Sequence, residues 1–88
     1  MMTDPLYAEA MLGKDAEEFW QSDIGRYILG RIEEEEKEAV EILVKVSPWR
    51  RRRIMELQSR ISRAQSIKGW FSELIISGRQ ALEQLEDQ

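Results

Sequence analysis

The chain has 88 residues, 34% of them charged, a net charge of −4 at pH 7, and neither cysteine nor histidine. This length fits a single domain, residues 1–88, and the missing residue types exclude disulfides, thiolate chemistry and histidine-based catalysis or metal binding. We therefore expect no catalytic residue, no cofactor and no metal site, and the acidic balance argues against a dedicated nucleic-acid binder.

Residues 1–21 predict one or two short helices. Asp4 can cap a helix that has Pro5 at its first position, where the missing N–H costs nothing. Gly13 can end that helix in the left-handed conformation, and Asp15 can then cap a second one. The segment lacks the positive and apolar regions of a signal peptide, and no apolar run approaches the roughly 20 residues that span a bilayer. We thus expect a protein that is neither secreted nor transmembrane.

Residues 22–46 predict the first long helix. Ser22 is a good N-cap, Asp23 suits the positive end of a helix, and the apolar residues that follow fall on one helical stripe. Ser47 and Pro48 then predict a turn, because the residue before a proline disfavours helix. Ser47 can in addition cap the helix that follows.

A second long helix is predicted over residues 48–86, because an apolar seam there alternates steps of three and four, as in a coiled coil. The seam consists of Ile54, Leu57, Ile61, Ala64, Lys68, Phe71, Ile75, Gly78, Leu82 and Leu85. No segment shows the alternation of a strand. The expected fold class is therefore all-α, a long antiparallel helical hairpin (about 23–46 and 48–86) with a turn at 47–48 and one or two short N-terminal helices before it.

The two long helices differ in expected length, about 36 Å against about 58 Å. Packed from a common turn, the second overhangs the first by roughly 22 Å, and Ile24 then faces Phe71. We expect the N-terminal helices to cover part of the apolar overhang and a homo-oligomer, a dimer before other states, to cover the rest. Aromatic residues should anchor this interface. Its expected residues are Trp70, Phe71, Leu74, Ile75, Leu82 and Leu85.

Four consecutive arginines, Arg50–Arg53, open the second long helix beside Trp49. One interpretation is a phosphate-binding patch in which Trp49 stacks on a base. The other is ion pairing with Glu35, Glu38 and Glu41 of the first long helix, since successive residues point around a whole helix. We favour the second interpretation, a solvated cluster in which the arginines that face the first long helix are ion-paired. The residues that a nucleic acid would contact are Arg50, Arg51, Arg52, Arg53, Arg60 and Arg63.

Two charged residues occupy apolar faces of the long helices. Glu35 lies on the stripe of the first helix, and Lys68 holds a seam position of the second. We expect Glu35 to meet Arg60 or Arg63, and Lys68 to fix the helix register or to extend to solvent. The other glutamates of this region form a solvated face, without the Glu-x-x-His pattern of helical di-iron sites.

The stretches "DIGRYILGRIEEEEKEAVEIL" and "IMELQSRISRAQSIKGWFSELIISGRQALEQLE" resemble small helical proteins encoded by tailed phages and prophages. Those proteins read approximately "LGxYLxxRAxxE…A…L", a short linker ending in proline, then "I…LQ…I…A…WL…AI…G…AL". The resemblance covers about residues 15–86 and brings no catalytic residues. This chain departs from it at Arg50–Arg53, where the linker tends to be acidic. The resemblance implies a phage-encoded accessory or morphogenesis protein, located in the host cytoplasm or associated with the virion.

These features predict a non-enzymatic, phage-encoded helical interaction protein that acts by self-association or partner binding. The expected partner is another copy of the chain, a phage structural protein or a host protein. The role would lie in particle assembly or in modulating a host protein. The alternative is a nucleic-acid-binding module that uses the Arg50–Arg53 cluster, and salt-dependent binding distinguishes the two hypotheses.

Overall fold

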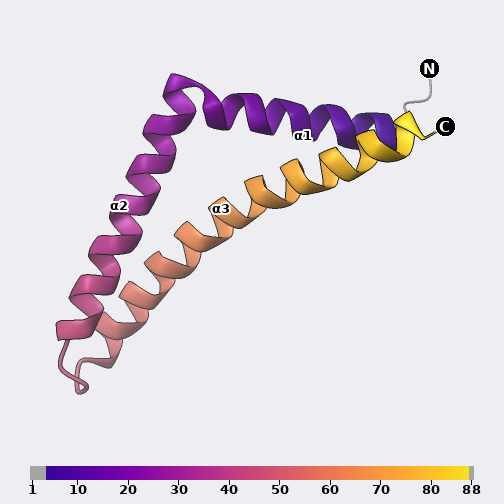
Figure 1. The fold of residues 1–88 in the computed structure, drawn as a ribbon. Helices are drawn as coiled ribbons and strands as arrows, with labels where there is room; N and C mark the ends of the chain where they lie inside the picture. The colour runs from indigo at the N-terminus through magenta and orange to yellow at the C-terminus, as the bar shows by residue number, and fades with distance from the viewer. Residues whose placement is uncertain (1–3, 88) are drawn as a thin grey trace.

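A computed structural model of the protein describes residues 4–87. Within them the chain forms three helices, α1 (Pro5–Gln21), α2 (Asp23–Lys45) and α3 (Arg51–Glu86), and no strand. The expected all-α class is therefore confirmed for this part of the chain. Figure 1 shows the helices arranged like the sides of a triangle, with the start of α1 and the end of α3 at the same corner.

α1 is one continuous helix, where the sequence allowed one or two. It begins as predicted, because Asp4 Oδ1 accepts a hydrogen bond from the Leu6 N–H (2.9 Å) and Pro5 occupies the first turn. It does not end at Gly13, which adopts no positive φ and is buried against α3. The predicted helix end is wrong because this glycine permits close packing and does not form a left-handed cap.

Ser22 forms the sharp corner between α1 and α2. Its backbone is extended (ψ 162°), and its Oγ donates to the Phe19 carbonyl (2.5 Å) and accepts from the Gly25 N–H (3.0 Å). The same residue thus ends α1 and caps α2, which confirms the predicted N-cap. A Cβ on Gly25 would collide with the Phe19 carbonyl, so this corner requires glycine at that position.

The turn between α2 and α3 is longer than the two residues expected. The Arg50 N–H donates to the Ser47 carbonyl (3.0 Å), which places Pro48 and Trp49 at the central positions of a reverse turn. α3 therefore begins at Arg51 and not at Pro48, and Arg50 holds its N-cap position without a side-chain capping bond. The prediction that Ser47 caps this helix is wrong, because its carbonyl closes the turn instead.

α2 and α3 lie close together near this turn and spread apart toward the corner at Ser22 (Figure 1). α3 continues through Gly69 and Gly78 without a break. α1 returns along the far half of α3, and its contact with α3 is more extensive than that of the longer α2. The overhang of α3 is therefore covered in part by α1, as expected for the N-terminal segment.

Phe71 shows where the predicted pairing of the long helices fails. It was expected to face Ile24, but it stacks on Trp20 (ring centroids 4.3 Å apart) and on Phe19 (5.6 Å). Ile24 remains 62% exposed. The expected register is wrong at this end because α2 leans away from α3 and the corner carries the last turn of α1 over Phe71.

The core of the described chain is a thin line of mostly small side chains. The molecule is elongated, 58 × 25 × 23 Å, with a radius of gyration of 17.9 Å, against about 12 Å for a compact domain of this length. Leu57 is the one large side chain within residues 4–87 that is fully buried. The buried apolar residues in this range are Ala16, Ala39, Leu57, Ala64 and Ala81.

Candidate interaction surfaces

Two glycines bring α1 and α3 into backbone contact. A Cβ added to Gly78 would lie 2.7 Å from Gly13 Cα, and one added to Gly13 would lie 2.5 Å from the Leu74 carbonyl oxygen. Ala16 of α1 and Ala81 of α3, both buried, extend this contact between small residues. The crossing allows the backbones to touch, and it aligns the neighbouring side chains of both helices along a common groove.

This α1–α3 groove lies on one side of the crossing and has a volume of about 380 Å³. Lys14, Glu17 and Arg79 frame it, and Arg79 Nη2 donates to Glu17 Oε1 across the two helices (2.6 Å). The groove is therefore an apolar surface with charges at its border. Its apolar lining consists of Tyr7, Ala10, Met11, Ile75, Leu82 and Leu85.

Of the six residues predicted to form an interface, Phe71 and Leu74 make contacts within the chain. Phe71 is stacked on Trp20, and Leu74 is half-buried with its carbonyl oxygen against Gly13. Both stabilise the packing of α1 on α3. Phe71 and Leu74 are therefore covered by the N-terminal helix α1, which was also predicted to pack on the overhang, and not by a second chain.

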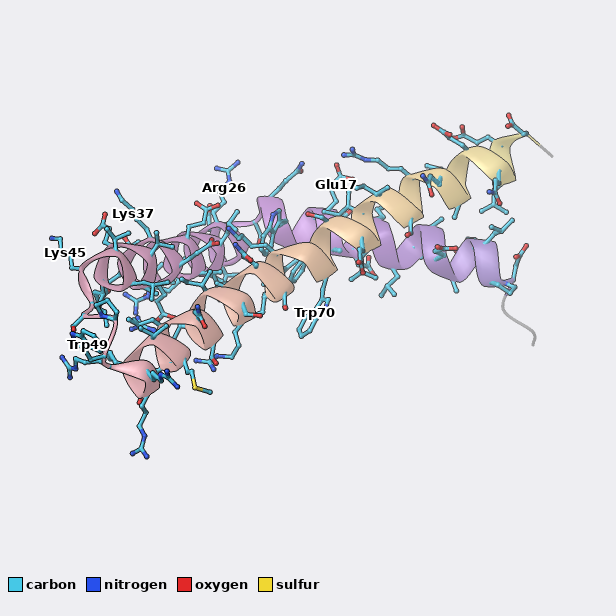
Figure 2. The ribbon with its side chains drawn as sticks, turned by 90° about the horizontal axis from the view of Figure 1, so that it is seen from below. Glu17, Arg26, Lys37, Lys45, Trp49 and Trp70 are labelled. Carbon is cyan, nitrogen blue, oxygen red and sulfur yellow. The ribbon has the colours of Figure 1, made fainter. Side chains whose placement is uncertain are left out.

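Three of the six, Ile75, Leu82 and Leu85, line the α1–α3 groove, so the structure brings them together. Trp70 lies apart from this surface and is 62% exposed. Figure 2 shows its side chain projecting from α3 on the side opposite to Arg26 of α2. The predicted set thus divides between the core, the groove and a separate exposed aromatic side chain.

Tyr7 and Met11 belong to the groove but were expected only to cover the overhang. They are spaced four residues apart and lie on one face of α1, and they remain 56% and 40% exposed. A pattern of two apolar residues one turn apart was visible in the sequence. The sequence could not show that the face of α1 carrying Gly13 would pack against α3, which leaves Tyr7 and Met11 at the side of the contact.

The turn and the first turns of α3 form the basic end of the molecule, Trp49, Arg50–Arg53, Arg60 and Arg63. Trp49 is 88% exposed, and Figure 2 shows it at the extreme end of the structure, near Lys45. Two shallow hollows meet there, one lined by Trp49 and Arg50–Arg53, the other by Arg52, Arg60 and Arg63. Arg52 and Glu56 line both hollows, so the basic residues form one continuous surface.

The prediction of ion pairs between this cluster and α2 is wrong for residues 4–87. Glu35 pairs with Arg31 of its own helix (3.8 Å) and not with an arginine of α3. Within residues 4–87, the cluster's ion pair is the one between Arg53 and Glu56 (3.4 Å), again within one helix. The ion pairs that form join residues of the same helix, and four arginines of the cluster are exposed to solvent: Arg50, Arg51, Arg52 and Arg63.

Lys68 of α3 and Glu36 of α2 form an ion pair between the two helices. Lys68 Nζ donates to Glu36 Oε1 (2.5 Å), and both side chains are partly buried. The hydrogen bond from Lys68 lowers the pKa of Glu36, helped by a hydrogen bond from Gln65 and opposed by desolvation. Lys68 thus acts at its seam position as a register contact, while Glu36 had been assigned to a solvated face.

This pair predicts a pH dependence of stability. Because the pKa of Glu36 is lower in the folded chain than its ordinary value of 4.5, the carboxylate stabilises the fold above that pH, and the contribution is lost as pH falls through the folded pKa. We expect the urea midpoint of the wild type to fall more between about pH 5 and about pH 3 than that of Glu36→Gln. Glu34→Gln, which alters an exposed pair with Arg31, should follow the wild type. Parallel profiles for the wild type and Glu36→Gln would contradict the role of the pair.

Within the described part of the chain, no three acidic side chains come together as ligands for a metal ion. None of the helices in residues 4–87 combines the length and the apolar character needed to cross a membrane. No known protein family, curated protein or solved structure matches the chain. Two surfaces of the described chain remain as candidate sites of interaction, the α1–α3 groove and the basic end.

Proposed function

We propose that this chain is a non-enzymatic helical interaction protein that acts by associating with a second copy of itself. The observation that carries this proposal is the surface that one chain leaves uncovered. Its accessible surface is 7117 Å², against about 5400 Å² for a compact protein of 10.4 kDa. A dimer interface of standard size covers about 800 Å² on each partner, which is well within this excess.

The uncovered surface is rich in apolar side chains. Five apolar residues are buried within residues 4–87, whereas thirteen large ones are at least 36% exposed. Single exposed apolar residues are ordinary, but so many around so small a core support the proposal that another molecule covers part of this surface. The exposed residues are Tyr7, Met11, Leu12, Ile24, Tyr27, Ile28, Val40, Val44, Trp49, Met55, Trp70, Ile76 and Leu82.

The α1–α3 groove is the surface that best suits a second copy. Two such helix pairs, related by a two-fold axis, form a four-helix arrangement in which each groove receives the apolar side chains of the other. Tyr7, Met11 and Leu82 would then meet their counterparts. The border is compatible with the same arrangement, because a two-fold axis can place Lys14 of one copy beside the Glu17–Arg79 pair of the other.

The resemblance to phage and prophage proteins extends this proposal to a biological setting. A self-associating helical protein of that origin would serve in particle assembly or as a small modulator of a host protein, in the host cytoplasm or on the virion. Purification of the tagged chain from infected cells, followed by identification of phage-encoded and host proteins bound to it, tests this part separately from self-association.

The substitution Leu82→Glu tests the proposed interface. In a single chain Leu82 is 49% exposed, so a charge there is tolerated, but in the dimer an unpaired carboxylate would be buried. We expect light scattering after size exclusion to show a dimer for the wild type and at least a tenfold weaker association for the variant. Circular dichroism should show unchanged helix content.

Ile76→Glu is the matched control. Ile76 is 55% exposed on the same helix but lies outside the groove, two residues from Gly78 and thus on the opposite face. This variant should remain dimeric. A wild-type monomer would overturn the proposed function, and a Leu82→Glu variant that still dimerises like the wild type would overturn the choice of the groove.

A further inference from the structure

The basic end concentrates positive charge in an otherwise acidic chain. Residues 38–63, which include the end of α2 beside the turn, hold seven basic side chains and three acidic ones, Glu38, Glu41 and Glu56, although the whole chain has a net charge of −4. They lie at one end of a molecule 58 Å long, whereas screening at physiological salt acts over about 8 Å. The local potential at this end is therefore positive, whatever the sign of the total charge.

The arginines of this end are available to a ligand. Arg50, Arg51 and Arg52 are exposed, and Arg53 pairs, among residues 4–87, with Glu56 one turn along the same helix. The two adjoining hollows extend this surface from Trp49 to Arg63, and the stretch of α3 between Arg52 and Arg63 is about 16 Å long. Guanidinium groups distributed along such a length suit a ligand with several phosphates, since each can contact a phosphate oxygen with paired N–H donors.

Trp49 adds a second kind of contact. Its indole is 88% exposed at the centre of a reverse turn, directly before four arginines. An aromatic face in a positive groove is the arrangement that binds unstacked bases, and each stacked base contributes about 1–3 kcal/mol. A duplex offers no free base face at its surface, so this residue favours a single strand over a duplex.

We propose that the basic end binds single-stranded nucleic acid, with the arginines on successive phosphates and Trp49 stacked on a base. This activity is independent of self-association, because the basic end lies at the opposite end of α3 from the groove (Figure 1). Four phosphate contacts on a single strand give a slope of about −3 for log affinity against log salt. Binding should therefore be readily measured at about 50 mM salt and much weaker at about 200 mM.

The test uses the full-length protein and a fluorescent oligothymidylate of about 16 nucleotides, with fluorescence anisotropy as the readout. The double variant Arg52→Ala/Arg60→Ala should bind at least tenfold more weakly than the wild type. The control, Arg26→Ala/Lys37→Ala, removes the same charge from α2, where Figure 2 shows both side chains projecting on the side away from Trp49. It should change the affinity by less than about twofold.

Trp49→Ala tests the stacking contact, and a loss of about fivefold or more is expected, with most of the affinity retained in Trp49→Phe. The turn position is exposed, so circular dichroism should show both variants folded. Three results would overturn the proposal: no binding of the oligonucleotide at low salt, equal losses in the two charge-matched double variants, or unchanged affinity in Trp49→Ala. Tighter binding to a duplex of the same length, or binding only to phosphatidylserine vesicles, would also overturn it.

Discussion

Gly78→Ala is expected to lower the free energy of unfolding by about 1–3 kcal/mol. The added Cβ would lie 2.7 Å from Gly13 Cα and 3.2 Å from the Glu9 carbonyl oxygen, and neither backbone atom can move unless α1 shifts as a whole. The helix preference of alanine over glycine, about 1 kcal/mol, offsets only part of this cost. Urea unfolding followed by circular dichroism, at one fixed protein concentration, measures the change.

The control for this prediction lies in the same helix. No atom lies within 4 Å of a Cβ added to Gly69, so Gly69→Ala should raise the free energy of unfolding by about 0.5–1 kcal/mol. The two substitutions are chemically identical, but their effects on the free energy of unfolding should have opposite signs. The melting temperatures of the two variants should then differ by roughly 10 °C or more. Equal stabilisation by both would show that α1 does not cross α3 at Gly78.

Phe71→Ala is expected to lower the free energy of unfolding by about 2–4 kcal/mol. Its ring lies 4.3 Å from that of Trp20 and 5.6 Å from that of Phe19, and the three rings join the end of α1 to the middle of α3. The estimate is below that for a fully buried phenylalanine because Phe71 is half-buried. Thermal unfolding of the variant and the wild type at matched concentrations provides the measurement.

Trp70→Ala is the neighbouring control, because Trp70 is 62% exposed and projects on the side opposite to Arg26 of α2. Its removal should change the free energy of unfolding by no more than about 0.5 kcal/mol. The two aromatic residues are adjacent in sequence and were predicted to act together as interface anchors. A cost for Trp70→Ala as large as that for Phe71→Ala would mean that Trp70, too, is covered in the folded protein.

The parts of the fold that depend on local interactions were predictable from the sequence. Asp4 with Pro5 marks the start of α1, and Ser22 with Asp23 marks the start of α2, because capping involves residues within one turn of each other. The apolar seam identified the buried face of the last helix for the same reason. Leu57, a seam residue, is fully buried in the structure.

The parts that depend on distant residues were not predictable in this way. Gly13 suits both a helix end and a close helix contact, and only the position of Gly78, far along the chain, decides between them. The start of α3 was missed for another reason, because Ser47 and Pro48 suit both a helix start and a reverse turn, and the local bond from the Arg50 N–H to the Ser47 carbonyl forms the turn. The register of α2 against α3 could not be read from helix lengths, because the corner at Ser22 determines how far the two helices spread apart.

The candidate surfaces show the same division. Ile75, Leu82 and Leu85 follow from the helical pattern, and the structure groups them in the groove. The partners of the arginines did not follow from charge alone, since Glu35, Glu38 and Glu41 were expected as partners and Arg53 pairs with Glu56 of its own helix. The structure leaves these arginines facing solvent, and it pairs Lys68 with Glu36, a choice that depends on the relative rotation of two helices.

We propose above all that a single chain leaves an apolar surface which a second copy covers. Sedimentation equilibrium of the unmodified protein, from micromolar to millimolar concentration, tests it most directly. We predict a molar mass that approaches twice the 10.4 kDa of the chain as concentration rises. A mass of 10.4 kDa at every concentration, with the protein folded, would contradict it.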